Sequence, residues 1–249
     1  MQGRHGIAQG ARSDPSRGHY HHGHLRSALV GAALKLVAKR GAEGFSLREA
    51  ARELGVSPAA AYRHFADKAA LLGAVAIDGM GRLAAEMEKG VARVPGPPGT
   101  AAHAAGTLLA VGGAYVEFAL RHRSHFRVMF GPWCEHPAMD QLPPEVLPGG
   151  RDPYQILIDA LDALVASGAV TAEARRGAEI AAWSTMHGLA SLLVDGAIEL
   201  PARQRAAVTA GLGRTLLLGL ACHPSVAGPA SAPVDGDPRH QSWKGKRRC

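Results

Sequence analysis

Residues that can bind anions are concentrated in the segment FSLREAARELGVSPAAAYRHFADK, which begins at Phe45. Their side chains are hydroxyls, a phenol, an imidazole and two kinds of cation: Ser46, Arg48, Ser57, Tyr62, His64 and Lys68. Several of them precede or open a predicted helix, where free N–H groups and the helix dipole favour an anion. The pattern therefore predicts contacts with the phosphates of a polyanion such as DNA, and Arg26, farther upstream, is expected to add another.

The residues between these donors are mostly small and apolar. Pro58, Ala59 and Ala60 are expected to face outward, where they can touch thymine methyl groups but cannot hydrogen-bond to base edges. Arg63 is the long donor on the same predicted helix, and its target is either the DNA backbone or a guanine. Sequence preference would then also depend on DNA shape or on the arginine-containing arm at the N-terminus.

The segment is expected to fold as two short helices joined by a tight turn. Ser46 and Glu49 have the spacing of a capping box, so a helix begins after Ser46. Gly55 ends that helix because glycine adopts a positive φ without strain, and Ser57-Pro58 caps and opens the next one. Two short helices arranged in this way form a helix-turn-helix, whose second helix enters the major groove of DNA.

The pattern S-L-R-E-x-A-x-x-L-G-V-S-x-x-A-x-Y-R-H-F-x-x-K resembles the DNA-binding domain of TetR-type transcriptional regulators, over about residues 20–76. The resemblance implies that the Tyr-x-His…Lys positions, which are Tyr62, His64 and Lys68, contact phosphates. The alternative is a pair of short helices in an unrelated α-helical protein. Such a protein would not also supply Tyr-Arg-His-Phe followed by Asp-Lys at these spacings.

Charge is distributed unevenly along the 249 residues. The net charge is +7, and residues 1–68 hold eleven Lys and Arg against five Asp and Glu. Residues 239–249 add five basic residues and no acidic one, so the middle of the chain is net acidic. A basic N-terminal part joined to an acidic body is typical of a protein that offers one face to a polyanion, although a soluble protein with basic tails has the same balance.

Composition favours a helical protein of the cytoplasm. Hydrophobic residues make up 47% of the chain and aromatic residues 5%, which favours closely packed helices over a β sandwich. No apolar run approaches the ~20 residues of a membrane helix, and no hydrophobic signal segment opens the chain. Cys134, Cys222 and Cys249 share no metal-ligand spacing and are expected to be free thiols in a reducing compartment.

The two ends of the chain lack hydrophobic periodicity. Residues 1–19 and 224–249 are expected to be a disordered basic arm and a disordered basic tail. Histidines are frequent near the N-terminus, which suggests a metal site, but no Cys, Asp or Glu accompanies them at ligand spacing. Neither a metal nor a cofactor is therefore expected. The Tyr-His-His-Gly lead-in at Tyr20 is similar to one subgroup of TetR-like sequences.

Apolar periodicity predicts an all-α fold of about nine helices. A first helix ends before Gly41, and a long helix from Lys68 to about Val91 joins the DNA-binding part to the body. Further helices are expected near residues 101–119, 125–130, 154–168, 171–199 and 201–223, with an irregular loop over residues 131–153. The expected domains are residues 20–76, for DNA binding, and 77–223, for effector binding and dimerisation.

Trp183 and His187 are four residues apart and so share one face of a predicted helix, with Gly188 allowing a close helix crossing. The Trp-x-x-x-His-Gly pattern resembles one class of TetR-like C-terminal domains. Two interpretations stay open, an effector pocket or an aromatic core plug, because both are mostly apolar. The residues concerned are Tyr115, Phe118, Phe126, Met129, Tyr154, Trp183, Met186 and His187. Asp195 is either a polar pocket group or a solvated side chain.

The last two predicted helices are rich in Ala and Gly, as at Gly188, Gly196, Ala207 and Gly211. Small residues let helices approach closely, so this hairpin is suited to pair with its copy as a four-helix bundle. Regulators that the chain resembles are usually homodimers built in that way. The alternative is that these small residues pack only within one subunit.

The expected protein is a homodimeric transcriptional regulator that binds double-stranded DNA at a palindromic operator. We expect a repressor that a small-molecule effector releases from that operator. The alternative is a regulator without such an effector, controlled by a protein partner or acting as an activator. An enzyme is not expected, because the chain carries no G-x-S-x-G, no His-Glu-x-x-His and no phosphate loop.

Overall fold

The computed structural model describes residues 22–131 and 151–222, apart from the side chains of residues 22 and 23. These residues form ten helices and no strand, so the expected all-α class is confirmed. The N-terminal arm 1–19, the tail 224–249 and most of the loop 131–153 lie outside the described residues. The helices are α1 His22–Arg40, α2 Leu47–Glu53, α3 Pro58–Tyr62, α4 Lys68–Val91, α5 Ala101–Arg121, α6 Arg123–Phe130, α7 Pro153–Ala166, α8 Ala172–Arg175, α9 Ala178–Val194 and α10 Ala202–Ala221.

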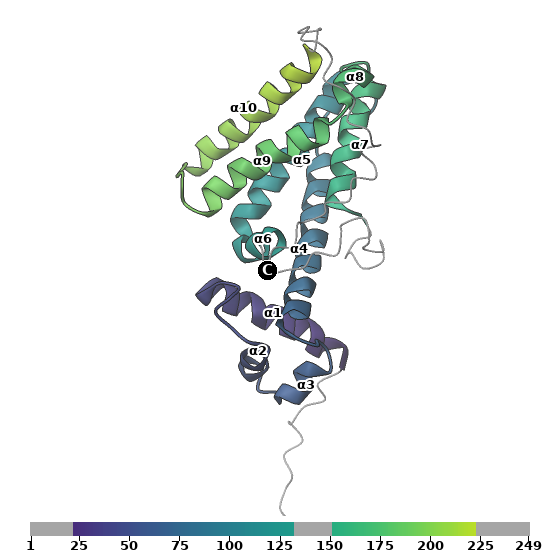
Figure 1. The fold of residues 1–249 in the computed structure, drawn as a ribbon. Coiled ribbons are helices and arrows are strands. Elements are labelled where there is room, and N and C mark those ends of the chain that lie inside the picture. The colour runs from purple at the N-terminus through teal and green to yellow at the C-terminus, as the bar shows by residue number, and fades with distance from the viewer. Residues whose placement is uncertain (1–21, 132–150, 223–249) are drawn as a thin grey trace, which may run out of the picture.

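The first three helices form a small lobe at one end of the molecule, as Figure 1 shows. Helix α1 packs against α2, α3 and α4, and Leu29, Leu36 and Phe65 are buried between them. The turn between α2 and α3 is tight because Gly55 adopts a φ of +67°. The lobe therefore has the helix-turn-helix geometry that the spacing predicts.

Helix α4 is the continuous helix that joins this lobe to the body, and α6 of the body also contacts α1 (Figure 1). Asp67 caps its first turn by accepting a hydrogen bond from the backbone N–H of Ala70, at 2.8 Å. An apolar stripe buries residues along nearly its whole length: Leu71, Leu72, Val75, Met80, Leu83, Ala84 and Met87. Because the lower part of α4 packs on α1 and the upper part on α5, α6 and α7, a movement of α4 moves the lobe with it.

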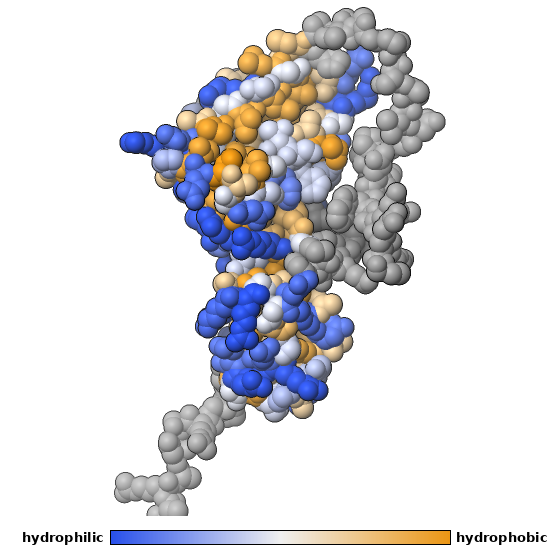
Figure 2. Space-filling view, turned by 60° about the vertical axis from the view of Figure 1, so that its left-hand side comes forward, coloured by the Kyte–Doolittle hydropathy of each residue, from blue (hydrophilic) through white to orange (hydrophobic). Residues whose placement is uncertain are grey.

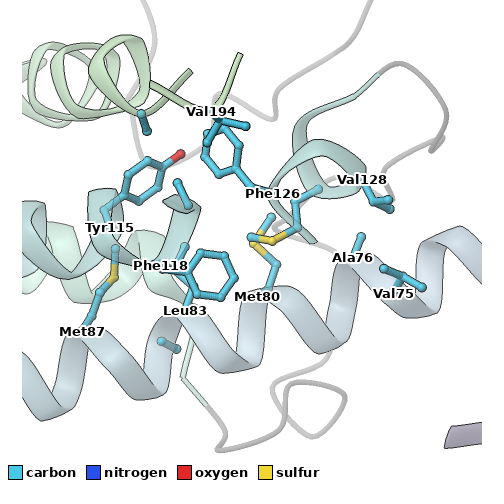
Figure 3. Packing of buried hydrophobic residues seen from close by; sticks show 14 of the residues in the cluster. Val75, Ala76, Met80, Leu83, Met87, Tyr115, Phe118, Phe126, Val128 and Val194 are labelled. Carbon is cyan, nitrogen blue, oxygen red and sulfur yellow. The ribbon is translucent and has the colours of Figure 1, made fainter. Parts of the chain in front are cut away.

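Helix α5 is the central helix of the body. It packs against α4, α6, α7, α9 and α10. By length and composition α5 would also suit a membrane span, but the core helix of a globular protein has the same properties. Figure 3 shows Phe118 of α5 among Met80 and Leu83 of α4. The apolar character of α5 therefore serves helix packing.

The expectation of a single helix over residues 171–199 is wrong. The structure divides it into α8 and α9 at Gly177, whose φ of +73° interrupts the helix. Helix α9 then ends at Val194, and Gly196, with a φ of +74°, turns the chain toward α10. Left-handed backbone at these two glycines stops a helix that apolar periodicity alone would continue. This break accounts for the tenth helix.

Helices α9 and α10 form a hairpin on the surface of the body. On α9, the exposed residues Ile180, Ser184, Gly188 and Leu192 follow one another at intervals of four, so they form a single row. Large apolar side chains are exposed on both helices and the turn between them: Ile180, Leu192, Ile198, Val208 and Leu218. We call this surface the outer face, and Figure 2 shows apolar colour running along it.

The predicted close crossing at Gly188 is not found within the subunit. A Cβ atom at Gly188 would meet nothing within 4 Å. The close approach in this hairpin occurs instead at Gly213 of α10, where a Cβ atom would collide with a side-chain carbon of Leu109. Gly213 thus lets α10 pack closely against α5, whereas Gly188 of α9 faces outward.

Candidate DNA interface and aromatic cluster

The two predicted helix caps of the lobe are formed, and they use their hydroxyl groups differently. The Ser46 Oγ accepts from the N–H of Glu49 at 3.2 Å, and the Glu49 carboxylate accepts from the N–H of Ser46 at 2.8 Å and from its hydroxyl at 3.1 Å. These hydrogen bonds from Ser46 lower the pKa of Glu49. The Ser57 Oγ accepts from the N–H of Ala60 at 3.2 Å, and within the described part of the chain its own proton is not donated.

The outward face of α3 differs from the expectation at one position. Pro58 and Ala59 are exposed, but Ala60 is only 8% exposed and belongs to the core. Its expected outward orientation is wrong, because this five-residue helix rests on both α1 and α2 and turns Ala60 inward with Ala61. A contact between the Ala60 side chain and a thymine methyl is therefore not supported.

The donors around α3 are placed at the surface of the lobe. Tyr62 is 45% exposed, and Arg48 and Arg63 are exposed as well. His64, which follows the end of α3, is half-buried. Tyr62 is not buried against the acidic body, so its phenol is free to meet a ligand from solvent.

Two cations of the lobe lie over buried aromatic rings. The Lys68 ammonium lies 5.3 Å from the centre of the Phe45 ring and donates to the Glu43 carbonyl at 3.0 Å. The Arg26 guanidinium lies 5.1 Å from the centre of the Phe65 ring. Cation–π contacts of this kind restrain a long side chain while its charge remains available. An ammonium has three donors, so Lys68 keeps two after its bond to Glu43.

In the body, six rings from four helices form one aromatic cluster: Tyr115 of α5, Phe126 and Phe130 of α6, Tyr154 of α7, and Trp183 and His187 of α9. Tyr115 and Phe126 are buried, at 6% and 4% exposure. The other four rings are half-buried, and neighbouring ring centres lie between 4.8 and 6.3 Å apart. We call the two buried rings the floor of the cluster and the four half-buried rings its rim.

Hydrogen bonds join three of these rings. Trp183 donates its indole N–H to the Tyr115 hydroxyl at 3.3 Å, and this hydroxyl lies 2.8 Å from Nδ1 of His187. Burial raises the pKa of Tyr115 and lowers the pKa of His187, so both groups favour their neutral forms. The cluster is therefore apolar, with one internal chain of hydrogen bonds.

Some of the predicted lining residues are not part of this cluster. Phe118 and Met129 are completely buried, at 0% and 1% exposure. Phe118 packs against His122 with ring centres 4.9 Å apart, on the α4 side of α5, whereas the Tyr115 hydroxyl points away from α4 (Figure 3). Met186, 7% exposed, packs against Gly112 of α5. For these three residues the structure supports the core interpretation.

Phe130 belongs to the cluster although it is missing from the predicted lining. Its ring centre lies 4.8 Å from His187 and 6.2 Å from Trp183. The available signal was its position four residues after Phe126, which places both rings on one face of α6. For Asp195 the structure supports the solvated alternative and not the pocket one, because its side chain is 65% exposed and forms an ion pair with Arg127.

A buried carboxylate flanks the cluster at Tyr154. Glu179 is 4% exposed and accepts from Arg175, which also donates to Asp162 at 2.8 Å. Burial raises the pKa of Tyr154, and the negative charge of Glu179 raises it further. Within the described residues, no group of three or more His, Cys, Asp or Glu side chains is placed to hold a metal ion.

Charged contacts between α4 and α6 were not anticipated from the sequence. His125, 7% exposed, lies 2.9 Å from a carboxylate oxygen of Asp78, which also accepts from Arg82 at 2.6 Å. The hydrogen bond from His125 is the main reason that the pKa of Asp78 falls to about 2. A Cβ atom at Gly79 would lie 2.5 Å from the Met129 sulfur, so α6 rests directly on α4 at this glycine.

Two known protein families match the chain, one over the DNA-binding lobe and one over the body. Residues 29–75 match the bacterial regulatory proteins of the tetR family, and residues 108–215 match the tetracyclin repressor-like C-terminal domain. No curated protein matches the chain.

Solved structures show the same fold. A protein with unknown function from Rhodococcus sp. RHA1 is 32% identical and superposes with a TM-score of 0.64 over 82% of this chain and 98% of its own. A tetR-family regulatory protein from Rhodococcus RHA1 is 20% identical, with a TM-score of 0.54 over 80% and 98%. The TetR-family regulator PfmR from Thermus thermophilus is 21% identical, with a TM-score of 0.53 over 77% and 98%. The chain therefore belongs to the tetR family and is a DNA-binding transcriptional regulator.

Proposed function

We propose that this protein is a homodimeric repressor that leaves a palindromic operator when a small molecule binds at the aromatic cluster. The observation that carries the proposal is the position of α6. Its Phe126 and Phe130 belong to the cluster, while its His125 and Met129 contact α4. A ligand that displaces α6 therefore acts on the helix that carries the DNA-binding lobe. Such a regulator acts in the cytoplasm, where the DNA is.

On DNA, α3 would enter the major groove with Pro58 and Ala59 against thymine methyl groups. Arg48, Tyr62, His64, Lys68 and Arg26 surround that helix and would bind phosphates, and Arg63 would reach the backbone or a guanine. Ser57 can add a hydroxyl donor, because among the described residues its hydroxyl only accepts, from the N–H of Ala60. Ser46 serves as a cap, because its hydroxyl already donates to Glu49.

The outer face of α9 and α10 would form the dimer interface. Large exposed apolar side chains are costly in water, and on α9 Gly188 lies in the same row as the exposed Ile180 and Leu192. Gly188 leaves room there for a close helix of a second copy. Two hairpins related by a two-fold axis would form a four-helix bundle. The two lobes would then face the same side of the dimer and reach successive major grooves. In this arrangement residues 20–76 bind DNA and residues 77–223 bind the effector and the second subunit.

Effector release requires a ligand that prefers one orientation of α4. Binding can shift the population of operator-competent dimers only by the difference in its affinity for the two states. A ligand bound against the half-buried rings would press on Phe130 and move α6, which rests on α4 at Gly79. The lobes would then change their separation, and the operator would bind only one of the two arrangements well.

The test begins with an operator selected from a random pool of duplex DNA by the purified full chain. Fluorescence anisotropy then measures its affinity in the presence of a library of small aromatic compounds. We expect at least one compound to weaken binding by about tenfold or more in the wild type and to have no effect on a folded Trp183→Ala variant. If no compound changes the operator affinity or the melting temperature, a protein partner controls the regulator instead.

A further inference from the structure

The rim of the aromatic cluster carries a polar atom that nothing in the described structure uses. His187 engages its Nδ1 with the Tyr115 hydroxyl at 2.8 Å, and its Nε2 makes no hydrogen bond within residues 22–131 and 151–222. The ring is half-buried, and its centre lies 4.8 Å from Phe130 and 6.0 Å from Trp183. Nε2 is therefore a polar position among the half-exposed rings that a ligand would contact.

The chain of hydrogen bonds decides whether Nε2 donates or accepts. Trp183 has only a donor, so the Tyr115 oxygen accepts from it at 3.3 Å. The hydroxyl proton of Tyr115 then has one nearby acceptor among the described residues, which is Nδ1 of His187. If His187 donated from Nδ1 instead, the proton of a tyrosine that is 6% exposed would lose its partner. A neutral imidazole that accepts at Nδ1 carries its proton on Nε2, so Nε2 is a donor.

The charges near the rim disfavour an anionic ligand. The carboxylates of Glu179 and Asp152 both lie close enough to Tyr154 to influence its phenol. The guanidinium that opposes them, on Arg175, is already shared between Glu179 and Asp162. Among the described residues, Arg175 is the only cation that acts on Tyr154, and a buried anion without a partner is costly.

We propose that the effector is a neutral, planar aromatic molecule with a carbonyl oxygen, which accepts a hydrogen bond from Nε2–H of His187 while its rings lie against Phe130, Trp183 and Tyr154. This inference rests on the proposed effector site and adds the chemical class of the ligand. Flat rings suit edge and face contacts with aromatic side chains. The single donor selects ligands that carry an acceptor, because a ligand without one leaves Nε2–H unpaired in a partly desolvated position.

Three matched probes test the proposal on the full-length wild-type protein by isothermal titration calorimetry. The ketone 2-acetylnaphthalene carries the acceptor, 2-isopropenylnaphthalene has the same shape without it, and 2-naphthoate carries a negative charge. We expect the ketone to bind about tenfold more tightly than the alkene, since one unpaired buried donor costs about that factor. The naphthoate is expected to bind more weakly than the ketone.

Two variants test whether the preference for the ketone over the alkene depends on Nε2 of His187 and on the Tyr115 hydroxyl. His187→Phe keeps a ring of similar size and removes the donor, so the ketone and the alkene should bind equally. Tyr115→Phe removes the hydroxyl that fixes the tautomer, so the preference should shrink without vanishing. In the wild type, the nitrogen shifts of the His187 ring in a long-range proton–nitrogen NMR spectrum should be those of the Nε2–H form. Circular dichroism melting confirms that each variant is folded.

The outcomes separate this inference from the proposed function. Equal binding of the ketone and the alkene to the wild type overturns the ligand class while the effector site stands, provided that either one weakens operator binding. Tightest binding of the naphthoate, or the Nδ1–H form in the NMR spectrum, also overturns it. If none of the three probes binds, the ligand class is wrong, and the compound library on the wild type and on Trp183→Ala decides separately whether the effector site stands.

Discussion

Asp78 of α4 accepts a hydrogen bond from Nε2 of His125 of α6 at 2.9 Å, although 47 residues separate them. An ionised carboxylate can only accept, so the proton of this bond belongs to the imidazole. His125 is the residue before Phe126, whose ring centre lies 5.4 Å from His187. The aromatic cluster and the helix that carries the lobe are thus joined through neighbouring residues of one short helix.

Substitution His125→Phe should weaken the response to an effector. The ring still fills its buried position, but α6 no longer holds the Asp78 carboxylate, so less of a movement of α6 reaches α4. The ratio of operator affinities without and with a releasing compound should fall several-fold, which is the usual scale of coupling between two sites. His122→Phe is the matched control, because Glu86 keeps its contact with Arg121 when His122 is lost. An equal loss in both variants would contradict a specific role for His125.

The contact between Asp78 and His125 should make the free energy of unfolding fall at acid pH. Its pKa falls from the ordinary value of 3.8 to about 2 in the folded chain, mainly through the hydrogen bond from His125. A depressed pKa means that the stabilisation is complete above pH 3.8 and is lost as the pH falls toward 2. Asp78→Asn should therefore lose less stability than the wild type across that window in chemical denaturation. Glu117→Gln, at an exposed carboxylate of α5, is the control and should follow the wild type.

His187 should produce a second pH dependence, in a different window. Burial lowers its pKa below the ordinary value of 6.5, so the unfolded chain binds a proton more readily than the folded one. The stability attached to neutral His187 is present above pH 6.5 and is lost as the pH falls below it. His187→Phe should remove that loss in denaturant titrations carried out from pH 6.5 downward. An unchanged pH profile would show that His187 is solvated like a surface histidine.

Ser46→Ala and Ser57→Ala should separate capping from DNA contact. Each substitution removes a helix cap and should lower the free energy of unfolding by about 1 kcal/mol. The Ser57 hydroxyl keeps a free proton for a phosphate, whereas the Ser46 hydroxyl donates to Glu49. Under conditions in which both variants are fully folded, operator affinity should fall about fivefold for Ser57→Ala and stay near the wild-type value for Ser46→Ala. Equal operator affinities of the two variants in fluorescence anisotropy would contradict this difference between the two hydroxyls.

Gly188→Leu should convert the proposed dimer to a monomer. Within one subunit its side chain would start in open space, because a Cβ atom there meets nothing within 4 Å. In a four-helix bundle, a leucine at the centre of the outer face would force the two α9 helices apart. Gly31→Leu is the control, because Gly31 is also helical and also has open space around its Cβ position. Sedimentation that leaves Gly188→Leu dimeric would place the interface elsewhere.

Local sequence determined the features of this protein whose partners lie within a few residues. The caps at Ser46, Ser57 and Asp67 and the turn at Gly55 each satisfy their hydrogen bonds or backbone angles within one helical turn. Such features depend on residue type and spacing alone. They were sufficient to place the helix-turn-helix and the long connecting helix. The break at Gly177 is also local, but apolar periodicity continues through it and hides it.

Only the tertiary structure decided the features that depend on packing between distant elements. Ala60 turns inward because α3 rests on two helices, and Phe118 and Met129 are core residues because they lie on the α4 side of α5 and α6. The Tyr115–His187 hydrogen bond joins residues 72 positions apart, and no spacing rule reaches that far. Aromatic residues at helical spacing look alike in a core and in a binding site, because both bury apolar area. The packing of neighbouring helices determines which rings remain open.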